Sequence, residues 1–354
     1  MAEGFLTRDG VDWNELWYGG ILPATQMYNE DLVDFESMWT SPIDEGYIKL
    51  FHRGDNSYEK ISDLSVPTNV AVVKGRIRPE PDIWGIGTGF TWRALVENTV
   101  EEVMEINSQL QFEDRDFMRK QVLAVLLQAP GTSTTKWGLW DGNFKSEEGI
   151  TTPPDFGVHT FTAAHTHYYT TGNPVASGVL LEDLSVAKKH IREHGHFGSL
   201  TTIMSDLQVQ QLEQIALPIW DAGQGLGGAP VGNARPLNLN KFENSLSNEV
   251  IREGFRGRLV GMDILETAYM PDNYFVVTEN TKGMFKQEKE NPSVKGLILL
   301  PGEVGAYPIQ NSKQFRWHKF GVRMRSFAVA VEISADATYT TPTVYGTGNV
   351  DTDY

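Results

Sequence analysis

The spacing of apolar residues changes near residue 91 and divides the first part of the chain into strand-like and helical segments. Tyr47–Arg53 and Val70–Arg78 alternate apolar and polar residues across a turn-rich stretch, which predicts an extended hairpin with a long loop. The prolines and glycines of the following 79–90 stretch are expected to end that element. From Thr91, the expected N-cap, apolar residues recur every three or four positions through Leu126, which predicts an amphipathic helix.

That helix would be unusually long for a globular protein. It would run for about 37 residues, or roughly 55 Å, with a break expected near Phe112–Asp114. A helix of this length between β elements suggests a scaffold rod rather than one layer of a repeating α/β fold.

The second half of the chain mixes short helices with strands. Residues 131–178 predict loops and short strands, and Leu181–His194 predicts a helix with Leu184, Ala187 and Ile191 inward and Gly195 as its stop. A buried strand is expected at 199–205, then a helix through Gln214 capped by Asp206. Later strand-like runs occupy 258–267, 274–279, 296–300 and 314–333.

Residues 1–45 combine apolar anchors with acids and breakers but show little helical or strand periodicity. Residues 1–50 contain ten acids and two bases, a net charge of about −8. The pattern is typical of an arm that lies on another surface; an irregular piece packed on its own subunit is equally compatible. The candidate anchors are Phe5, Trp13, Trp17, Tyr28, Phe35 and Trp39.

Composition excludes several classes of protein. The 354 residues include 46 acids, 30 bases and no cysteine, for a net charge of −16. This charge disfavours a protein that mainly binds nucleic acid, and the missing cysteine excludes disulfides, thiolate nucleophiles and cysteine metal sites. The sequence shows no signal peptide and no apolar run of membrane-spanning length, so we expect a soluble protein of intracellular origin.

Two histidine groups are candidate metal sites. His190, Glu193 and His194 form an HxxEH motif, which in a metal-dependent hydrolase supplies two ligands and a general base. The motif lies in the last turn of a short helix, where histidine also complements the helix dipole. His159, His165 and His167 lie together without an acid between them. We favour structural roles for both groups and assign no catalytic, metal or cofactor-binding residue.

Two further patterns have ordinary explanations. Gly223, Gly225, Gly227 and Gly228 fit a dinucleotide-binding GxGxxG motif, but neither the preceding strand nor the following helix is present, so a flexible loop is favoured. The run 312–325 contains five cations and no acid. If the run is one long strand, one face of it would contain Phe315, Trp317, Lys319, Gly321, Arg323 and Arg325. Such a face suggests either a nucleic-acid groove or pairing with the acidic arm. The overall acidity favours pairing.

The order of these elements resembles the HK97-fold major capsid proteins of tailed bacteriophages. Residues 90–128 are similar to the family's spine helix, and 180–215 to the helix, strand and helix of its axial domain. Residues 259–279 resemble its strand, Met-Pro turn and strand, and 314–333 its closing strand. The resemblance implies an α+β fold with an N-terminal arm, an E-loop hairpin, a spine helix in a peripheral (P) domain and a mixed axial (A) domain.

The resemblance also implies a domain plan. The arm would occupy residues 1–45, the E-loop 46–82, the P domain 83–137 with a return at 283–326, the A domain 138–282, and the closing strand and tail 327–354. Residues 223–228 would form a loop near the capsomer axis. Besides the arm anchors, the expected inter-subunit contacts are the cations of the E-loop and the closing strand: Arg53, Lys60, Lys74, Arg76, Arg78, Lys313, Arg316, Lys319, Arg323 and Arg325.

The implied function is self-assembly into hexamers and pentamers of an icosahedral phage head. The head would enclose double-stranded DNA without sequence-specific binding and would be assembled in the host cytoplasm, away from membranes. Because the arm begins almost at Met1, we expect a separate scaffolding protein, together with a portal and a possible decoration protein. The alternatives are an encapsulin-like compartment shell and, more remotely, a hydrolase using residues 190–194.

Overall fold

The protein folds into two compact units, each built from three stretches of the chain. Unit 1 comprises Met1–Ile48, Arg78–Arg119 and Phe285–Phe320, and unit 2 comprises Lys49–Ile77, Lys120–Met284 and Gly321–Tyr354. The computed structural model describes residues 6–31, 39–43, 48–53, 72–77, 81–91, 96–129, 138–141, 152–212, 255–289, 291, 295–300 and 309–343. Helices and mixed sheets give the α+β class that the sequence predicts.

The sheet of unit 1 is centred on the long strand β12. Its order is β1-β10-β12-β11, with β4 also paired to β12. The bounds are β1 Thr40–Ile43, β4 Asp82–Thr91, β10 Met284–Glu288, β11 Leu297–Leu300 and β12 Ile309–Val322.

Strand β4 occupies a glycine-rich stretch where the sequence predicts the end of the hairpin and no new strand. Gly85 pairs with Phe315 of β12, and a Cβ on Gly85 would lie 2.9 Å from the Phe315 ring. The glycine therefore leaves room for the ring of its cross-strand neighbour, so here it permits a strand.

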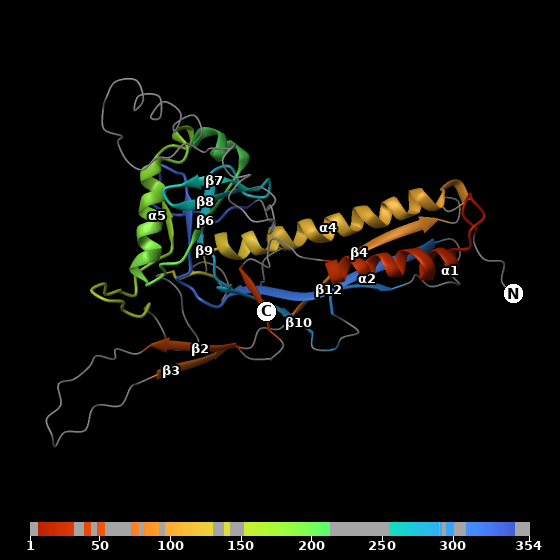
Figure 1. Ribbon diagram of the computed structural model, residues 1–354, viewed down its shortest axis with the longest axis horizontal. Helices are drawn as coiled ribbons and strands as arrows, with labels where there is room; N and C mark the ends of the chain where they lie inside the picture. The colour runs from red at the N-terminus through yellow and green to blue at the C-terminus, as the bar shows by residue number, and fades with distance from the viewer. Residues whose placement is uncertain are drawn as a thin grey trace, which may run out of the picture. The chain divides into compact units, whose positions relative to one another are not determined.

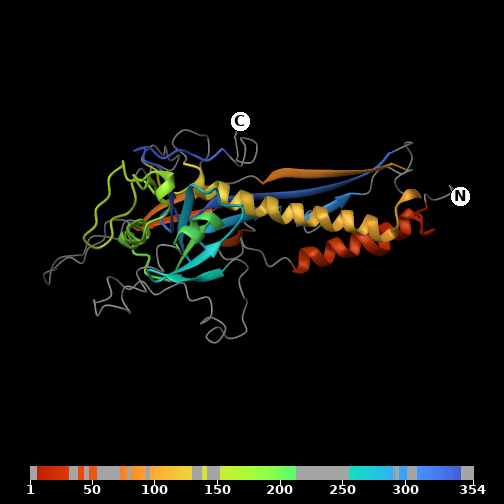
Figure 2. The ribbon, with the colours of Figure 1, turned by 90° about the horizontal axis from the view of Figure 1, so that it is seen from above.

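A helical segment from Trp13 to Asp31 replaces the irregular arm expected from the sequence. It consists of α1 (Trp13–Leu16), a π-helical turn η1 (Trp17–Ile21) and α2 (Leu22–Asp31). Leu16, Trp17 and Ile21 pack with Val103 of α4, and the red segment lies beside gold α4 in Figures 1 and 2. Packing on a neighbouring helix stabilises a segment whose own sequence is a poor helix former.

The long helix α4 spans Val100–Leu127, 28 residues or about 42 Å. Its start corrects the predicted cap, because Thr91 ends β4 while Thr99 forms a capping box with Glu102. The Thr99 N–H donates to Glu102 Oε2 (2.8 Å), and the Glu102 N–H donates to Thr99 Oγ1 (3.3 Å). The helix continues without the break expected near Phe112–Asp114.

Unit 2 has a six-stranded sheet in the order β5-β13-β9-β6-β8-β7. Its strands are β5 Tyr168–Thr170, β6 Leu200–Met204, β7 Phe255–Leu259, β8 Met262–Glu266, β9 Tyr274–Glu279 and β13 Ala328–Glu332, and a short 3-10 turn η3 covers Val175–Ser177. Helix α5 (Leu181–Glu193) packs on the sheet through Leu184, Ala187 and Ile191, all fully buried (Figure 1). Gly195, at φ +86°, ends it as the sequence predicts.

Two runs that the sequence predicts as single strands are each two strands. Residues 258–267 turn at Val260 and Gly261, whose φ values of +53° and +75° match a tight hairpin between β7 and β8. Residues 314–333 divide into β12 and β13, which belong to different sheets. The helix after β6 begins at Asp206 as expected, but Ser205 caps it, because Gln208 N–H donates to Ser205 Oγ (3.4 Å).

The expected hairpin strands are present as β2 (Ile48–Arg53) and β3 (Val72–Ile77), which form a two-stranded sheet. The stretch between them lies outside the described residues. Within the described part of the chain, no helix is both long and apolar enough to cross a membrane.

Candidate functional site

The cations of β12 lie on alternating faces of the strand, and the more buried face is the polar one. Gln314, Arg316, His318 and Phe320 are buried, whereas Phe315 and Trp317 are partly exposed. The strand ends at Val322, so Arg323 and Arg325 lie in the connection to β13. This corrects the expectation that Arg323 and Arg325 share a strand face with Phe315, Trp317 and Lys319.

Arg316 forms a bidentate ion pair with Asp114 of α4. Arg316 Nε donates to Asp114 Oδ1 (2.9 Å), and a terminal nitrogen donates to Oδ2 (2.5 Å). The Tyr28 hydroxyl also donates to Asp114 Oδ2 (2.9 Å). Two parallel N–H bonds fix both distance and orientation, so this pair sets the register between α4 and β12.

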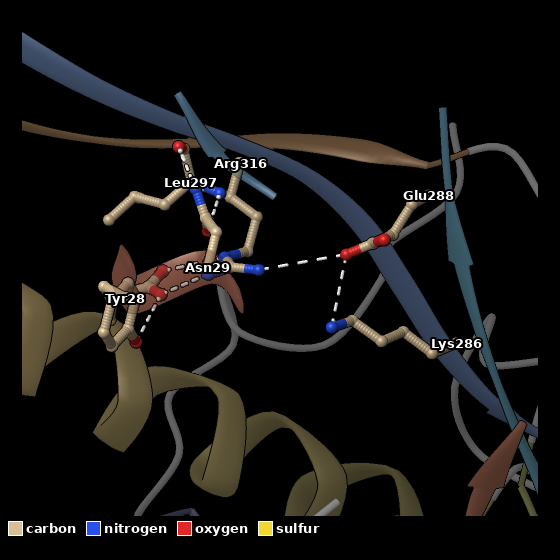
Figure 3. Close-up of polar contacts among 7 residues, drawn as sticks. Tyr28, Asn29, Lys286, Glu288, Leu297 and Arg316 are labelled. Carbon is tan, nitrogen blue, oxygen red and sulfur yellow. Dashed lines mark hydrogen bonds and ion pairs between the residues drawn. The ribbon is translucent and has the colours of Figure 1, made fainter. Parts of the chain in front are cut away.

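A second carboxylate extends the network along the sheet. Arg316 lies 3.8 Å from Glu288 of β10, and Lys286 lies 3.2 Å from the same oxygen (Figure 3). The amide of Asn29 in α2 donates to the Leu297 carbonyl and accepts from the Leu297 N–H, both at 2.9 Å. Burial alone would lower the pKa of Arg316, but Asp114, Tyr28 and Glu288 outweigh it and raise that pKa. Arg316 therefore stays charged within its own chain.

The other predicted cations differ in exposure. Lys319 is buried, Arg325 is buried with its guanidinium 5.6 Å from the Trp140 ring centre, and Arg323 is exposed. Arg53, Lys74 and Arg76 lie on β2 and β3 and Lys313 on β12, but their side chains lie outside the described part. Lys60, Arg78 and the glycines at 223, 225, 227 and 228 lie wholly outside it. The inter-subunit roles of all these residues stay predictions.

The predicted arm anchors also differ in their surroundings. Trp17 and Trp39 are buried within the chain, and Tyr28 is held on Asp114. Phe5 and Phe35 lie outside the described residues, as does the side chain of Trp13. The N-terminal helical segment instead exposes Tyr18 (63%) and Met27 (62%), which are not among the anchors predicted from the sequence. Among the described side chains of this segment, these are the large apolar ones that are most exposed.

A second exposed apolar surface borders the C-terminal half of α5. Phe156 and Phe197 lie with ring centres 6.0 Å apart, and neighbouring Val158 is 91% exposed. They line a shallow groove with Lys188 and Arg192 of α5. Its members come from two separate loops and from α5, so no local sequence pattern reveals it.

Four histidines converge in unit 2. His165 and His167 lie just before β5, which begins at Tyr168. His190 lies in the last turn of α5, and His194 directly follows that helix. His194 Nε2 lies 2.8 Å from His165 Nε2 and 3.1 Å from His167 Nε2. The cluster joins His165 and His167 of one candidate group with His190 and His194 of the other.

The remaining histidines of that sequence region are not part of the cluster. His159 is exposed, and its backbone pairs with Phe156. His196 contacts Glu279 (2.7 Å) and Ser326 (3.0 Å). An HxH and an HxxxH pair within 30 residues is the sequence signal that could have suggested the convergence.

Burial holds the clustered imidazoles in their neutral form. Burial and His165 lower the pKa of His190 to about 4, and burial with His165 and His190 lowers that of His194 to about 3. Burial also lowers the pKa of His167 well below its ordinary value and, more weakly, that of His165, where Glu193 opposes the shift. At neutral pH each of these rings therefore keeps one nitrogen without a proton, whose lone pair can accept a hydrogen bond or bind a metal.

Comparison with known proteins gives structural relatives only. No protein-family model and no curated protein matches the sequence. A solved chain from Mycobacterium phage Patience is similar over 99% of this chain and 98% of its own, with a TM-score of 0.65 and 19% identity. A chain of the bacteriophage PhiM1 mature capsid covers 85% and 87%, with a TM-score of 0.51 and 11% identity.

A third relative comes from the capsid of a native GTA particle. It covers 85% of this chain and 90% of its own, with a TM-score of 0.50 and 12% identity. At these identities the similarity establishes the fold, and it extends over both units. The chain therefore has the HK97-like fold of phage capsid proteins, as its sequence pattern suggested.

Proposed function

We propose that this chain is a major capsid protein that assembles with copies of itself into the hexamers and pentamers of an icosahedral phage head. The observation that supports this most directly is the structural match to the Patience chain over nearly the full length of both chains. This match includes the N-terminal segment and both units, and the PhiM1 and GTA chains to which this chain is also similar come from capsids. The proposed role is structural rather than enzymatic.

The exposed apolar side chains are consistent with burial between subunits. Tyr18 and Met27 on the N-terminal helical segment, and Phe156, Val158 and Phe197 beside α5, expose large apolar groups in the isolated chain. Fully burying one such side chain contributes about 1.5–3 kcal/mol, so a few of them offset the ordering of a contact. We propose these surfaces as subunit contacts, together with the exposed Arg323.

The charge balance fits enclosure of DNA without binding to its sequence. A net charge of −16 disfavours tight contact between the shell and phosphate. The acidic N-terminal segment and the cations of the hairpin strands would set register and salt sensitivity between subunits. A scaffolding protein, a portal and a decoration protein are the expected partners of such a shell in the infected cell, and the virion its final location.

Electron microscopy of the expressed chain tests the proposal. We expect closed particles with five-fold and six-fold capsomers when the untagged chain is produced alone or with the products of neighbouring genes. A chain that stays monomeric under all these conditions would contradict the proposal. Particles filled with a protein cargo, and lacking DNA in the native source, would favour a compartment shell instead.

A charge placed on the N-terminal segment sharpens this test. Met27→Glu should leave the monomer folded but reduce particle yield at least tenfold, because it places a charge in a proposed apolar contact. Gln26→Glu adds the same charge at the adjacent exposed position and serves as the matched control. Equal particle yields from both variants would remove Met27 from the contact.

A further inference from the structure

The four-histidine cluster has the composition of a transition-metal site. Imidazole nitrogen suits zinc and the neighbouring divalent transition metals, and a tetrahedral set of four side chains is the usual form of a structural zinc site. The candidate nitrogen atoms of His165, His167, His190 and His194 all lie within 4.8 Å of one another.

The hydrogen bond of His167 fixes which of its nitrogens faces the cluster. Its Nδ1 lies 2.7 Å from the Ala328 carbonyl oxygen, which can only accept, so Nδ1 carries the proton. Nε2 therefore presents a lone pair toward His194. A backbone carbonyl that orients a histidine in this way is the common outer partner of a metal ligand.

His190 provides an independent indication. Its Nε2 is buried and has no hydrogen-bond partner among the described residues. A buried polar atom without a partner costs free energy, and a bound cation would remove that cost. Its ring stacks on His165, with centres 4.7 Å apart and planes at 10°, so it is already ordered.

The spacing agrees with tetrahedral coordination after small movements. Zinc–nitrogen bonds of about 2.0–2.1 Å imply nitrogen–nitrogen separations of about 3.3–3.4 Å in a tetrahedron. The separations of His194 Nε2 from His165 Nε2 and His167 Nε2, 2.8 and 3.1 Å, lie slightly below that value, and all four candidate ligand atoms lie within 4.8 Å of one another. Rotations of the side chains on fixed backbones can cover such differences.

We propose that His165, His167, His190 and His194 bind one divalent transition-metal ion of the zinc class. This replaces the expectation from the sequence that the chain has no metal ligand. Four protein ligands leave no open position for a substrate, and Glu193 forms an ion pair with Lys189 (3.7 Å) on α5. The ion therefore ties the segment before β5 to the end of α5, a structural role rather than hydrolysis.

Metal analysis of the whole chain tests this site independently of shell assembly. The protein is produced without a polyhistidine tag and purified without metal resin or chelator. We expect about one metal ion per chain in the wild type and in His159→Ala, and at least a tenfold loss in His194→Ala. His159 is the matched control because it is exposed and outside the cluster.

The chelator-treated wild type decides the question if His194→Ala does not fold. Added Zn²⁺ should raise Tm by several degrees, and added Co²⁺ should give the intense visible absorption of a tetrahedral complex. A wild type that lacks metal, shows no Tm shift with Zn²⁺ and gives only the weak spectrum of hydrated Co²⁺ would overturn the proposal. Equal metal content in His194→Ala and the wild type would overturn it as well.

Discussion

The two units use a helix on a sheet in different ways. In unit 1, the face of β12 that meets α4 contains Gln314, Arg316 and His318. Helix α4 contributes Asp114, which pairs with Arg316, and Asn107, which accepts a hydrogen bond from Gln314. In unit 2, α5 meets its sheet through Leu184, Ala187 and Ile191, and the strands supply aliphatic side chains and Phe275. The contact between α4 and β12 depends on directional polar pairs, whereas the contact between α5 and its sheet depends on buried apolar area.

This difference separates positioning from bulk stability. A bidentate pair tolerates little sliding, so Arg316 and Asp114 hold a 28-residue helix in one register on a long strand. Apolar packing stabilises through buried area and accepts small shifts more readily. A mutation should therefore have its largest effect where a buried charge loses its partner.

Asp114→Ala is expected to have the largest effect of the changes considered. It leaves Arg316, whose side chain is 2% exposed, without its main counter-charge and should lower the free energy of unfolding by about 3–5 kcal/mol. Urea unfolding of the unassembled chain measures this. The double variant Asp114→Leu with Arg316→Met should recover most of the loss; a double variant as unstable as Asp114→Ala would show that packing, not charge, is responsible.

Leu184→Ala should have the next largest effect. The side chain is fully buried between α5 and the sheet of unit 2, and its truncation should cost about 2–5 kcal/mol through lost burial and a cavity. The same urea titration applies. Val186, on the same helix, is 49% exposed, so Val186→Ala is the control and should change the free energy of unfolding by less than about 0.5 kcal/mol.

His318→Phe should stabilise unit 1 by about 1–3 kcal/mol at neutral pH. His318 is fully buried among Trp84, Phe117 and Phe320, and neither ring nitrogen has a hydrogen-bond partner within the described part of the chain. A ring of similar size without polar atoms avoids that cost. A destabilised variant would point to an ordered water or another partner at His318.

The stability of the wild type relative to His318→Phe should depend on pH in a defined direction. Burial, followed by the charges of Arg316 and Lys286, lowers the pKa of His318 well below its ordinary 6.5. Below pH 6.5 the unfolded chain therefore binds a proton that the folded chain does not, and the wild type loses stability as the pH falls. The difference between His318→Phe and the wild type should widen from pH 7 to pH 5; a constant difference would refute the shift.

Thr99→Ala should have the smallest effect. It removes the side chain that caps α4 and should cost about 1 kcal/mol. Thr91→Ala, at the cap position that the sequence suggested, is the control. A larger loss from Thr91→Ala than from Thr99→Ala would contradict the capping assignment.

The sequence predicts best those elements whose signals are local. The end of α5 follows from Gly195, and its buried face follows from three- and four-residue spacing. The sequence did not predict β4 because glycine is a poor strand former by itself. The need for glycine at position 85 is explained only by the Phe315 ring, which lies more than 200 residues away in the chain. The helical form of 13–31 likewise depends on its packing against α4.

The functional clusters were predicted only in part, for the same reason. The cations of 312–325 are evident in the sequence, but Asp114, the partner that buries Arg316, lies in another element. Each histidine pair is visible locally, yet their convergence requires β5 and α5 to be placed in one unit. Sequence spacing identified these side chains and could not identify their partners.

The position of β13 has a consequence for the timing of synthesis. This strand, Ala328–Glu332, lies between β5 and β9 in the sheet, although both of those strands precede it in the chain. Until residue 332 has left the ribosome, β5 has no bridge to β9, and the edge of β9 is unpaired on that side. A nascent chain therefore cannot complete this sheet, and until β13 is available the open edges of β5 and β9 can pair with strands of other chains.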